Sequence, residues 1–295
     1  GRATATSTGP SAAVAMPAPA PIVPPVAPAP VVAAPVVPPV AAAPVAPRAP
    51  VLPVAEVDRD LLRESAFIVP DGPVTSISEE FRIVKRRLLA SVQAEINAGL
   101  GVAAQRILIC SANPGDGKTY SAINLALSIA TEKDHDVVLV DADFAKPSIL
   151  SSLGIAGQSG LMDALADPAV DVQDLIIPTD IPGLSVLPAG RQTNTDSEYL
   201  ASARTQEVLA SLTAGRPGRI VIFDSPPLLA ASPAATIAQH VGHALMVVRA
   251  DVTSERALRD ALSLIAGCNQ IQLLLNGVKF SPSGRSFGSY YGYGE

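Results

Sequence analysis

Short apolar runs alternate with longer amphipathic stretches along the chain from about residue 76 onward. The runs are rich in Val, Ile and Leu without polar alternation, which is typical of strands buried on both faces of a sheet. Between them, apolar residues recur at helical spacing. The predicted strands are 106–110, 137–140, 184–187, 219–223, 244–248 and 271–275. The predicted helices are 77–98, 118–132, 197–213, 232–240 and 254–266.

Alternation of strands and helices predicts an α/β fold with a mostly parallel sheet and helices on both faces. Ser76 and Glu79 have the spacing of a capping box at the start of the first helix,. In open sheets of this kind, ligands bind beyond the carboxyl ends of the strands. The residues that directly follow each predicted strand are therefore the first candidates for chemistry.

The N-terminal part of the chain has a different composition. Of the 28 prolines, 15 lie between Pro10 and Pro53, and the first 55 residues hold only two charges. Pro, Ala and Val without helical or strand period predict an extended, partly polyproline II arm, acting as a spacer or as a docking arm for a Pro-binding partner. The predicted organisation is a disordered arm at 1–58, a linker at 59–75, a folded P-loop domain at 76–281 and a flexible tail at 282–295.

Charge and cysteine content exclude several classes of function. The chain of 295 residues has a net charge of −6, which argues against nonspecific binding to nucleic acid or to anionic lipid,. Two cysteines exclude a disulfide scaffold and a Cys-rich metal site, and His240 and His243 are expected to be surface or capping residues,. No apolar run reaches the roughly 18 residues of a membrane helix, so contact with a membrane is expected only through a partner or an upstream segment.

The segment after the strand at 106–110 carries a phosphate-binding motif. SANPGDGKT (111–119) follows a strand and opens a helix, which is the context of a P-loop,. Its glycines let successive N–H groups turn toward one anion, and Lys118 and Thr119 are suited to phosphate and to Mg²⁺. The first glycine of the usual motif is replaced by Ala112. The predicted nucleotide contacts here are Asn113, Pro114, Gly115, Asp116, Gly117, Lys118, Thr119 and Tyr120.

Three carboxylates also follow predicted strands. Asp141 and Asp143 come after the strand at 137–140, and Asp224 ends the strand at 219–223. Acids in such places are costly without a cation, and Asp224 and the Thr119 hydroxyl fit the role of Mg²⁺ ligands. With Lys118, the three acids form the predicted catalytic set for phosphoryl transfer. Asn276 follows the last strand and either reads a nucleobase edge or forms an Asn-Gly turn,.

The end of the chain supplies candidate phosphate acceptors. Tyr290, Tyr291 and Tyr293 lie in the last six residues, among Gly and Ser residues that do not support a stable helix or strand,. Taken alone, such a segment is more often a disordered end. Beside a nucleotide site, it provides hydroxyl groups that could receive a phosphate.

Together, these motifs closely resemble the bacterial tyrosine kinases, the P-loop type found in polysaccharide-export loci, over roughly residues 76–295. The resemblance is especially close to the tyrosine autokinases of exosortase-linked exopolysaccharide loci. It is carried by SANPGDGKT, VVLVDAD, IVIFDSPPLL, the GLMDAL and LPAG segments and the tyrosine cluster. The family implies a fold of the MinD/ParA type, the use of ATP with Mg²⁺, and phosphorylation of the tail tyrosines of a neighbouring subunit.

The resemblance also implies roles for single residues. Asp141 would act as the base or orienting group for the tyrosine hydroxyl. Asp143, Asp224 and Thr119 would hold Mg²⁺, directly or through water. A family helix used for oligomerisation appears here with Glu79, Arg82 and Lys85, where the family has Arg in the last place. The alternative for that helix is a local ion pair on a solvated face. The family's arginine two residues after its second motif aspartate is Ala145 here, followed by Lys146,.

The resemblance further implies a cytoplasmic protein at the inner face of the bacterial inner membrane. There it would work with a transmembrane activator of the chain-length-regulator type, either separate or fused upstream of Gly1. Two other functions stay open: a positioning ATPase of the MinD/ParA type, and a nucleotide-gated scaffold of the polysaccharide machinery. The ATPase is disfavoured because Asn113 stands where those loops carry a signature lysine,.

Overall fold

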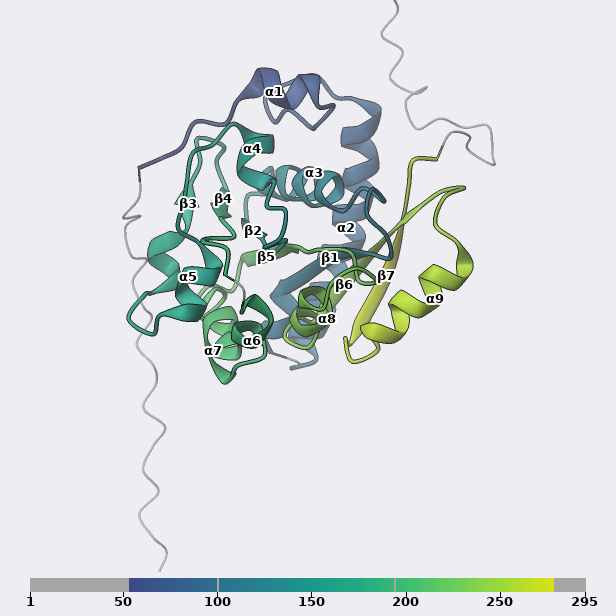
Figure 1. Ribbon diagram of the computed structural model, residues 1–295. Helices are drawn as coiled ribbons and strands as arrows, with labels where there is room; N and C mark the ends of the chain where they lie inside the picture. Colours follow the sequence, from purple (N-terminus) through teal and green to yellow (C-terminus); the bar gives the residue numbers. More distant parts are fainter. Residues whose placement is uncertain (1–52, 100, 194, 279–295) are drawn as a thin grey trace, which may run out of the picture. The chain divides into compact units, whose positions relative to one another are not determined.

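The computed structural model of the protein describes residues 53–278, except 100 and 194. Within this part, the predicted α/β fold is confirmed. One sheet has the strand order β3-β4-β2-β5-β1-β6-β7, and its pairings are parallel except that of β3 with β4 (Figure 1). The strands are β1 (Arg106–Ser111), β2 (Asp136–Asp141), β3 (Ile177–Pro178), β4 (Leu184–Leu187), β5 (Arg219–Asp224), β6 (His243–Arg249) and β7 (Gln270–Asn276).

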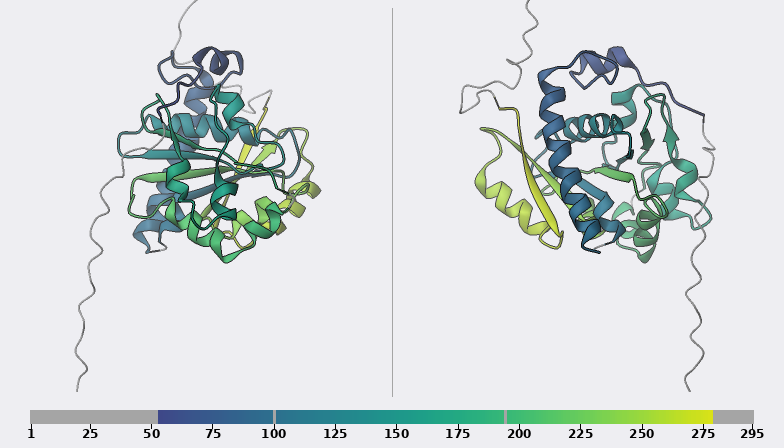
Figure 2. Two further views of the ribbon diagram at one scale, coloured as in Figure 1. Left: turned by 60° about the vertical axis from the view of Figure 1, so that its left-hand side comes forward. Right: turned by 180° about the vertical axis from the view of Figure 1, so that it is seen from behind.

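Helices cover both faces of the sheet (Figure 2). One buried apolar cluster joins the sheet to α1, α2, α3 and α4, and the other joins it to α5, α7, α8 and α9. The helices are α1 (Arg59–Glu64), α2 (Ser76–Asn97), α3 (Lys118–Ala130), α4 (Ile149–Leu153), α5 (Leu161–Ala166), α6 (Asp196–Leu200), α7 (Ala203–Ser211), α8 (Pro233–Ala238) and α9 (Glu255–Leu264). Short 3₁₀ turns cover Val102–Gln105 and Val172–Leu175. None of the described helices is long and apolar enough to cross a membrane.

Three of the predicted elements differ from the observed ones. The strand at 271–275 is not buried on both faces, because β7 lies at the edge of the sheet and leaves Leu273 57% exposed. The helix predicted at 197–213 is interrupted after Leu200 and forms α6 and α7. The capping residues of α2 are Thr75 and Ser78, which exchange backbone-to-side-chain hydrogen bonds, so Ser76 is the first helical residue and not the cap.

The segment 55–69, here called the N-terminal strap, packs onto the domain. Val57, Leu62 and Ile68 are buried, although the sequence places this segment in an arm and a linker. The strap pairs with the sheet edge through Ala55 and Thr179, and α1 within it packs against α4. Its apolar residues lie in short groups without a sustained helical or strand period, so a periodicity test does not reveal their burial,.

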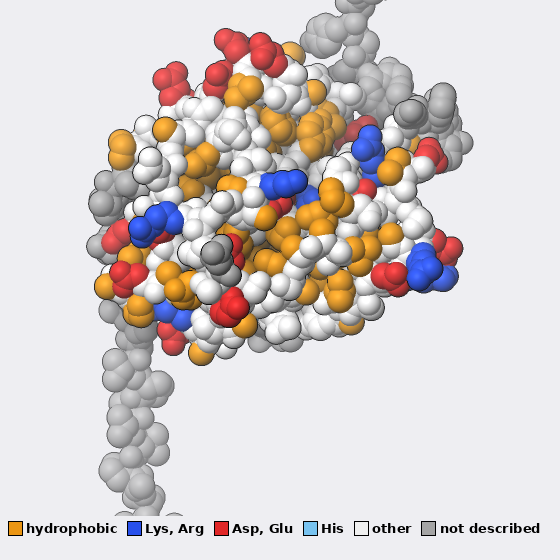
Figure 3. Space-filling view, viewed as in Figure 1, with side chains coloured by type: hydrophobic (Ala, Val, Ile, Leu, Met, Phe, Trp, Pro, Cys, Tyr) orange, Lys and Arg blue, Asp and Glu red, His pale blue; other side chains and the backbone are white. Residues whose placement is uncertain are grey.

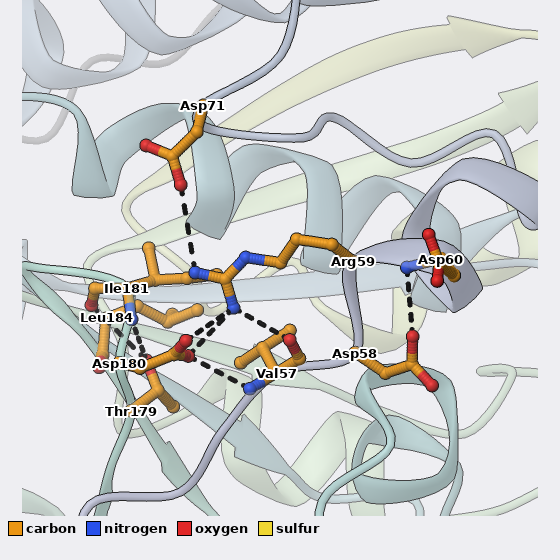
Figure 4. A network of polar contacts seen from close by, with 9 residues as sticks. All are labelled: Val57, Asp58, Arg59, Asp60, Asp71, Thr179, Asp180, Ile181 and Leu184. Carbon is orange, nitrogen blue, oxygen red and sulfur yellow. Dashed lines mark hydrogen bonds and ion pairs between the residues drawn. The ribbon is translucent and has the colours of Figure 1, made fainter.

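A polar network holds the beginning of the strap (Figure 4). Arg59 donates to the Asp180 carboxylate at 2.8 Å and to the Val57 carbonyl at 2.7 Å, and it lies 3.8 Å from Asp71. Asp180 also accepts the backbone N–H of Val57 at 2.9 Å. Acidic side chains gather on the surface over α1 (Figure 3). Asp180 therefore fixes the strap to the turn between β3 and β4.

Candidate functional site

The predicted P-loop lies between β1 and α3. Gly115 has a φ of +79° and Gly117 a φ of +99°, a region that glycine adopts without steric cost,. Lys118 begins α3 directly after the loop and is buried. Residues in these conformations turn successive N–H groups toward one point, and the start of α3 adds the positive end of its dipole. The local structure therefore suits a phosphate group.

The loop is braced by residues from the neighbouring end of the sheet. Asp116 is 1% exposed and accepts hydrogen bonds from the Asn113 N–H and the Thr253 hydroxyl, both at 3.0 Å. Asn276 donates its side-chain amide to the Asp116 carbonyl at 2.9 Å and accepts the N–H of Gly277. The structure thus uses Asn276 at the end of β7 to hold the loop.

Asp224 lies at the centre of the candidate site, fully buried. Its Oδ2 accepts the hydroxyl of Thr119 at 2.6 Å, whereas its Oδ1 is buried without a hydrogen-bond partner among the described residues. Burial raises the pKa of Asp224 to about 7, with smaller contributions from Asp141 and Asp143 and an opposing effect of the Thr119 hydrogen bond. A buried carboxylate oxygen without a partner is the kind of atom that a cation would satisfy.

Asp141 is the neighbour of Asp224 in the register of β2 and β5. Its Oδ2 accepts the N–H groups of Ser148 at 2.8 Å and Ile149 at 3.0 Å, the latter being the first residue of α4, and its Oδ1 accepts the N–H of Asp143 at 3.3 Å. Burial raises the pKa of Asp141 to about 6, although these three donors oppose the rise. A fixed carboxylate with a pKa near neutrality suits proton acceptance.

The predicted magnesium ligands fit a nucleotide-bound ion. Thr119 and Asp224 are in contact, and Asp143 is half-buried in the loop that follows β2. Among the described residues, no three His, Cys or acidic side chains form a closed metal cage. Mg²⁺ in nucleotide sites uses one or two carboxylates and takes its other ligands from phosphate oxygens and water, so this set has the composition that the ion requires.

Two predicted site residues are used elsewhere in the described structure. Tyr120 stacks on Phe67 with ring centroids 5.4 Å apart and donates its hydroxyl to the Ala66 carbonyl at 2.8 Å, so its side chain holds the strap and does not face the loop. Lys85 is 4% exposed and contacts Glu132 at 2.6 Å and the Ser128 carbonyl at 3.0 Å.

The remaining predicted residues divide between the surface and the undescribed end of the chain. Glu79 and Arg82 form a half-buried ion pair at 3.0 Å on α2. Lys85 does not share that surface, because it points into the contact between α2 and α3. The three predicted acceptor tyrosines, Tyr290, Tyr291 and Tyr293, lie outside the described residues.

The structure adds residues that the sequence did not single out. Gln192, which follows β4, donates to the carbonyls of Phe144 and Ala145 at 2.7 and 3.1 Å. Beside it, Arg191 forms an ion pair at 2.6 Å with Asp163 of α5. Asp163 lies in the GLMDAL segment and Arg191 directly follows LPAG, but no spacing rule connects an acidic residue at 163 to an arginine at 191.

Comparisons with known proteins point to one group. The chain is 28% identical over 235 residues to the tyrosine-protein kinase wzc of Salmonella typhimurium, covering 78% of this chain and 31% of that protein. It is 27% identical over 224 residues to the tyrosine-protein kinase YwqD of Bacillus subtilis, covering 75% of this chain and 87% of that protein. The chain therefore spans less than a third of the length of the Salmonella relative. No protein-family model matches.

A solved structure of a kinase domain is also similar to this chain. The kinase domain of VpsO superimposes with a TM-score of 0.53 and 30% sequence identity, covering 66% of this chain and 98% of that domain. This similarity includes almost the whole of the solved kinase domain.

Proposed function

Because the chain belongs to the bacterial tyrosine kinase family, we propose that it is an ATP-dependent protein-tyrosine autokinase whose acceptors are Tyr290, Tyr291 and Tyr293 of a neighbouring subunit. The observation that carries this proposal is the pair of carboxylates beside the P-loop. Asp224 is bonded to Thr119 and keeps one buried oxygen without a partner, and Asp141 is fixed next to it. Asp224 is thus suited to binding a cation, and Asp141 to accepting a proton.

In this proposal, ATP binds with its phosphates at the loop 112–117, where Lys118 neutralises negative charge,. Thr119, Asp143 and Asp224 would hold Mg²⁺, which supplies charge neutralisation to the phosphates. In the transfer, the phenolic oxygen of a tyrosine forms a bond to the γ-phosphorus. The bond from that phosphorus to the β,γ-bridging oxygen breaks, and ADP leaves. Asp141 orients the phenol and accepts its proton.

The proposed setting follows the family. The kinase acts as a homo-oligomer in which the tail of one subunit enters the site of the next, and it regulates exopolysaccharide polymerisation or export. A transmembrane activator of the chain-length-regulator type holds it at the inner face of the bacterial inner membrane. Each tail phosphate adds about −1.5 to −2 charges, and repulsion between phosphates would loosen the assembly.

Mass spectrometry of the full chain after incubation with ATP and Mg²⁺ tests the proposal. We expect phosphate on one or more of Tyr290, Tyr291 and Tyr293 in the parent chain and none in Lys118→Met, because the variant loses the cation at the phosphates,. Lys133→Met, at an exposed lysine beyond α3, is the matched control and should retain activity. Release of free phosphate without phosphotyrosine, or nucleotide binding without either product, would contradict the proposal.

A mixing experiment tests transfer between subunits. Lys118→Met chains keep their tail tyrosines and lack the catalytic lysine, whereas a chain with Phe at 290, 291 and 293 keeps the site and lacks the tail acceptors. If transfer occurs between subunits, the mixture places phosphate on the tail of the Lys118→Met chain. An unmodified tail in the mixture, with an active parent chain, would show that transfer stays within one chain.

A further inference from the structure

Arg191 is an exposed arginine whose side chain is nonetheless fixed. The side chain is 83% exposed, yet its Nε donates to Asp163 Oδ1 at 2.6 Å. Asp163 is 7% exposed, and its Oδ2 accepts the backbone N–H groups of Gly160 at 2.8 Å and Arg191 at 3.3 Å. Burial by itself raises the pKa of Asp163, but these hydrogen bonds outweigh it and the pKa is lowered. A buried, ionised carboxylate thus holds the guanidinium by one edge.

The two terminal nitrogens of this guanidinium have no hydrogen-bond partner among the described residues. They form a planar fork that matches the geometry of a phosphate or carboxylate group. The pairing with Asp163 has already restricted the side chain, so an anion that binds the fork costs less conformational entropy than one that binds a free arginine. The arrangement is therefore that of a preorganised anion-binding residue.

The position of Arg191 in the fold indicates which anion it meets. It follows β4, which is separated from β1 and its P-loop by β2 and β5. Adjacent strands lie about 4.8 Å apart, so β4 is about 14 Å from β1 but only about 5 Å from β2. Gln192 beside it contacts the loop that follows Asp143. Arg191 thus lies on the Asp141 side of the candidate site, away from the loop that suits the phosphates of the nucleotide.

The acceptor segment of the proposed function contains neighbouring tyrosines. Tyr290, Tyr291 and Tyr293 are one to three residues apart, which in an extended chain corresponds to about 3 to 10 Å,. When one of them occupies the site beside Asp141, another lies at a distance comparable to that between β2 and β4. A phosphate on that second tyrosine would carry about −1.5 to −2 charges and three acceptor oxygens.

We propose that Arg191 binds a phosphotyrosine already present in the acceptor tail and thereby favours phosphorylation of an adjacent tyrosine. This inference rests on the proposed function, and it makes Arg191 a specificity-determining residue for the second and third transfers. The first transfer does not involve it. Phosphorylation of the cluster then proceeds from singly to multiply modified tails faster than independent transfers would allow.

A time course of intact-mass spectra on the full chain tests this inference. In Arg191→Gln we expect the first phosphate to appear at a rate within about twofold of the parent, and the second and third to be slowed roughly tenfold, because a charge-assisted fork is lost. Arg191→Lys keeps the positive charge but lacks the planar fork, so its second and third transfers should be slowed almost as much. Arg256→Gln, at a 93% exposed arginine of α9, is the control and should match the parent.

A binding measurement distinguishes phosphotyrosine from nucleotide. The probes are synthetic peptides of residues 286–295, unmodified or phosphorylated at Tyr291, followed by fluorescence anisotropy against the Lys118→Met chain with and without Arg191→Gln. We expect only the phosphopeptide to lose affinity, roughly tenfold, while ADP affinity is unchanged. Equal rates for all transfers in Arg191→Gln, or a loss of ADP affinity in place of phosphopeptide affinity, would overturn the inference. Absence of tail phosphorylation in the parent chain would instead overturn the proposed function.

Discussion

At the scale of single residues, the candidate site is built from polar residues that directly follow apolar strands. Asp141 and Asp224 follow such strands, and the structure brings them together because their parallel strands are adjacent. Two placements were not predictable. Tyr120 and Asn276 make their contacts with Ala66 and Asp116, residues distant in the sequence, and no local pattern encodes such contacts.

Gly117 is the loop residue at which an added side chain would disturb the structure most. A Cβ there would lie 2.0 Å from Nδ2 of Asn276, the amide that holds Asp116, and its φ of +99° disfavours any other residue. Gly117→Ala should cost about 1–2 kcal/mol of folding free energy from the backbone and also displace Asn276, lowering nucleotide affinity by more than about tenfold. Titration calorimetry with ADP and thermal unfolding measure the two effects.

Gly215→Ala is the matched control for this change. Gly215 also has a positive φ, +69°, but a Cβ there would meet nothing within 4 Å. It should lose similar stability and keep its nucleotide affinity. An equal loss of affinity in both variants would show that the contact with Asn276 does not support the loop.

At the scale of elements, the central strands were predictable because each is a continuous apolar run. The strap and β3 were not, since the apolar residues of the strap follow no sustained period and β3 is only two residues long. Lys85 illustrates a different limit. Its place in an apparent surface motif indicates exposure, whereas the structure buries its ammonium group against the last turn of α3.

Lys85→Met tests whether this lysine supports folding or assembly. The variant removes donors to the Ser128 carbonyl and the Thr131 hydroxyl, as well as the contact with Glu132, at the end of α3. We expect it to lower the free energy of unfolding by about 1–3 kcal/mol, as measured by urea denaturation.

Arg82→Met provides the comparison, because Arg82 forms a half-buried ion pair with Glu79 on the same helix and is more exposed than Lys85. Its effect on unfolding should stay within about 1 kcal/mol, whereas its effect on molecular mass in solution reports on a subunit contact. A Lys85→Met chain of unchanged stability but smaller assembly would assign Lys85 to the interface and contradict the intramolecular role.

At the scale of the whole molecule, stability should depend on a buried pair far from the phosphate loop. His243 is fully buried at the start of β6, with Nε2 3.3 Å from Oε2 of Glu95 in α2, so the expectation of a surface or capping histidine was wrong. Burial lowers the pKa of His243, and Glu95 only partly opposes this. The unfolded chain therefore binds this proton more readily than the folded chain does.

The stability that the folded state gains by keeping His243 neutral should be fully present above the ordinary histidine pKa of about 6.5. It should be lost as the pH falls from that value toward the lower pKa of His243 in the folded chain. The midpoint of thermal unfolding should thus drop between pH 7.5 and 5.5, and less so in His243→Gln. Calorimetry at several pH values measures the drop, and an NMR titration of the His243 ring measures its folded pKa directly. An identical drop in both chains would contradict this assignment.

The N-terminal strap contacts the same helices that carry or position the proposed catalytic residues. Ala55 is paired with the edge of the sheet, the Asp58 N–H donates to Leu153 at the end of α4, and the Ile68 N–H donates to Asn124 in α3. Of these two helices, α4 begins at Ile149, whose N–H donates to Asp141, and α3 begins at Lys118. A mechanical load on the chain ahead of residue 55 would therefore reach the edge strands first. Only after that pairing yields would the tension act on α4 and α3 together.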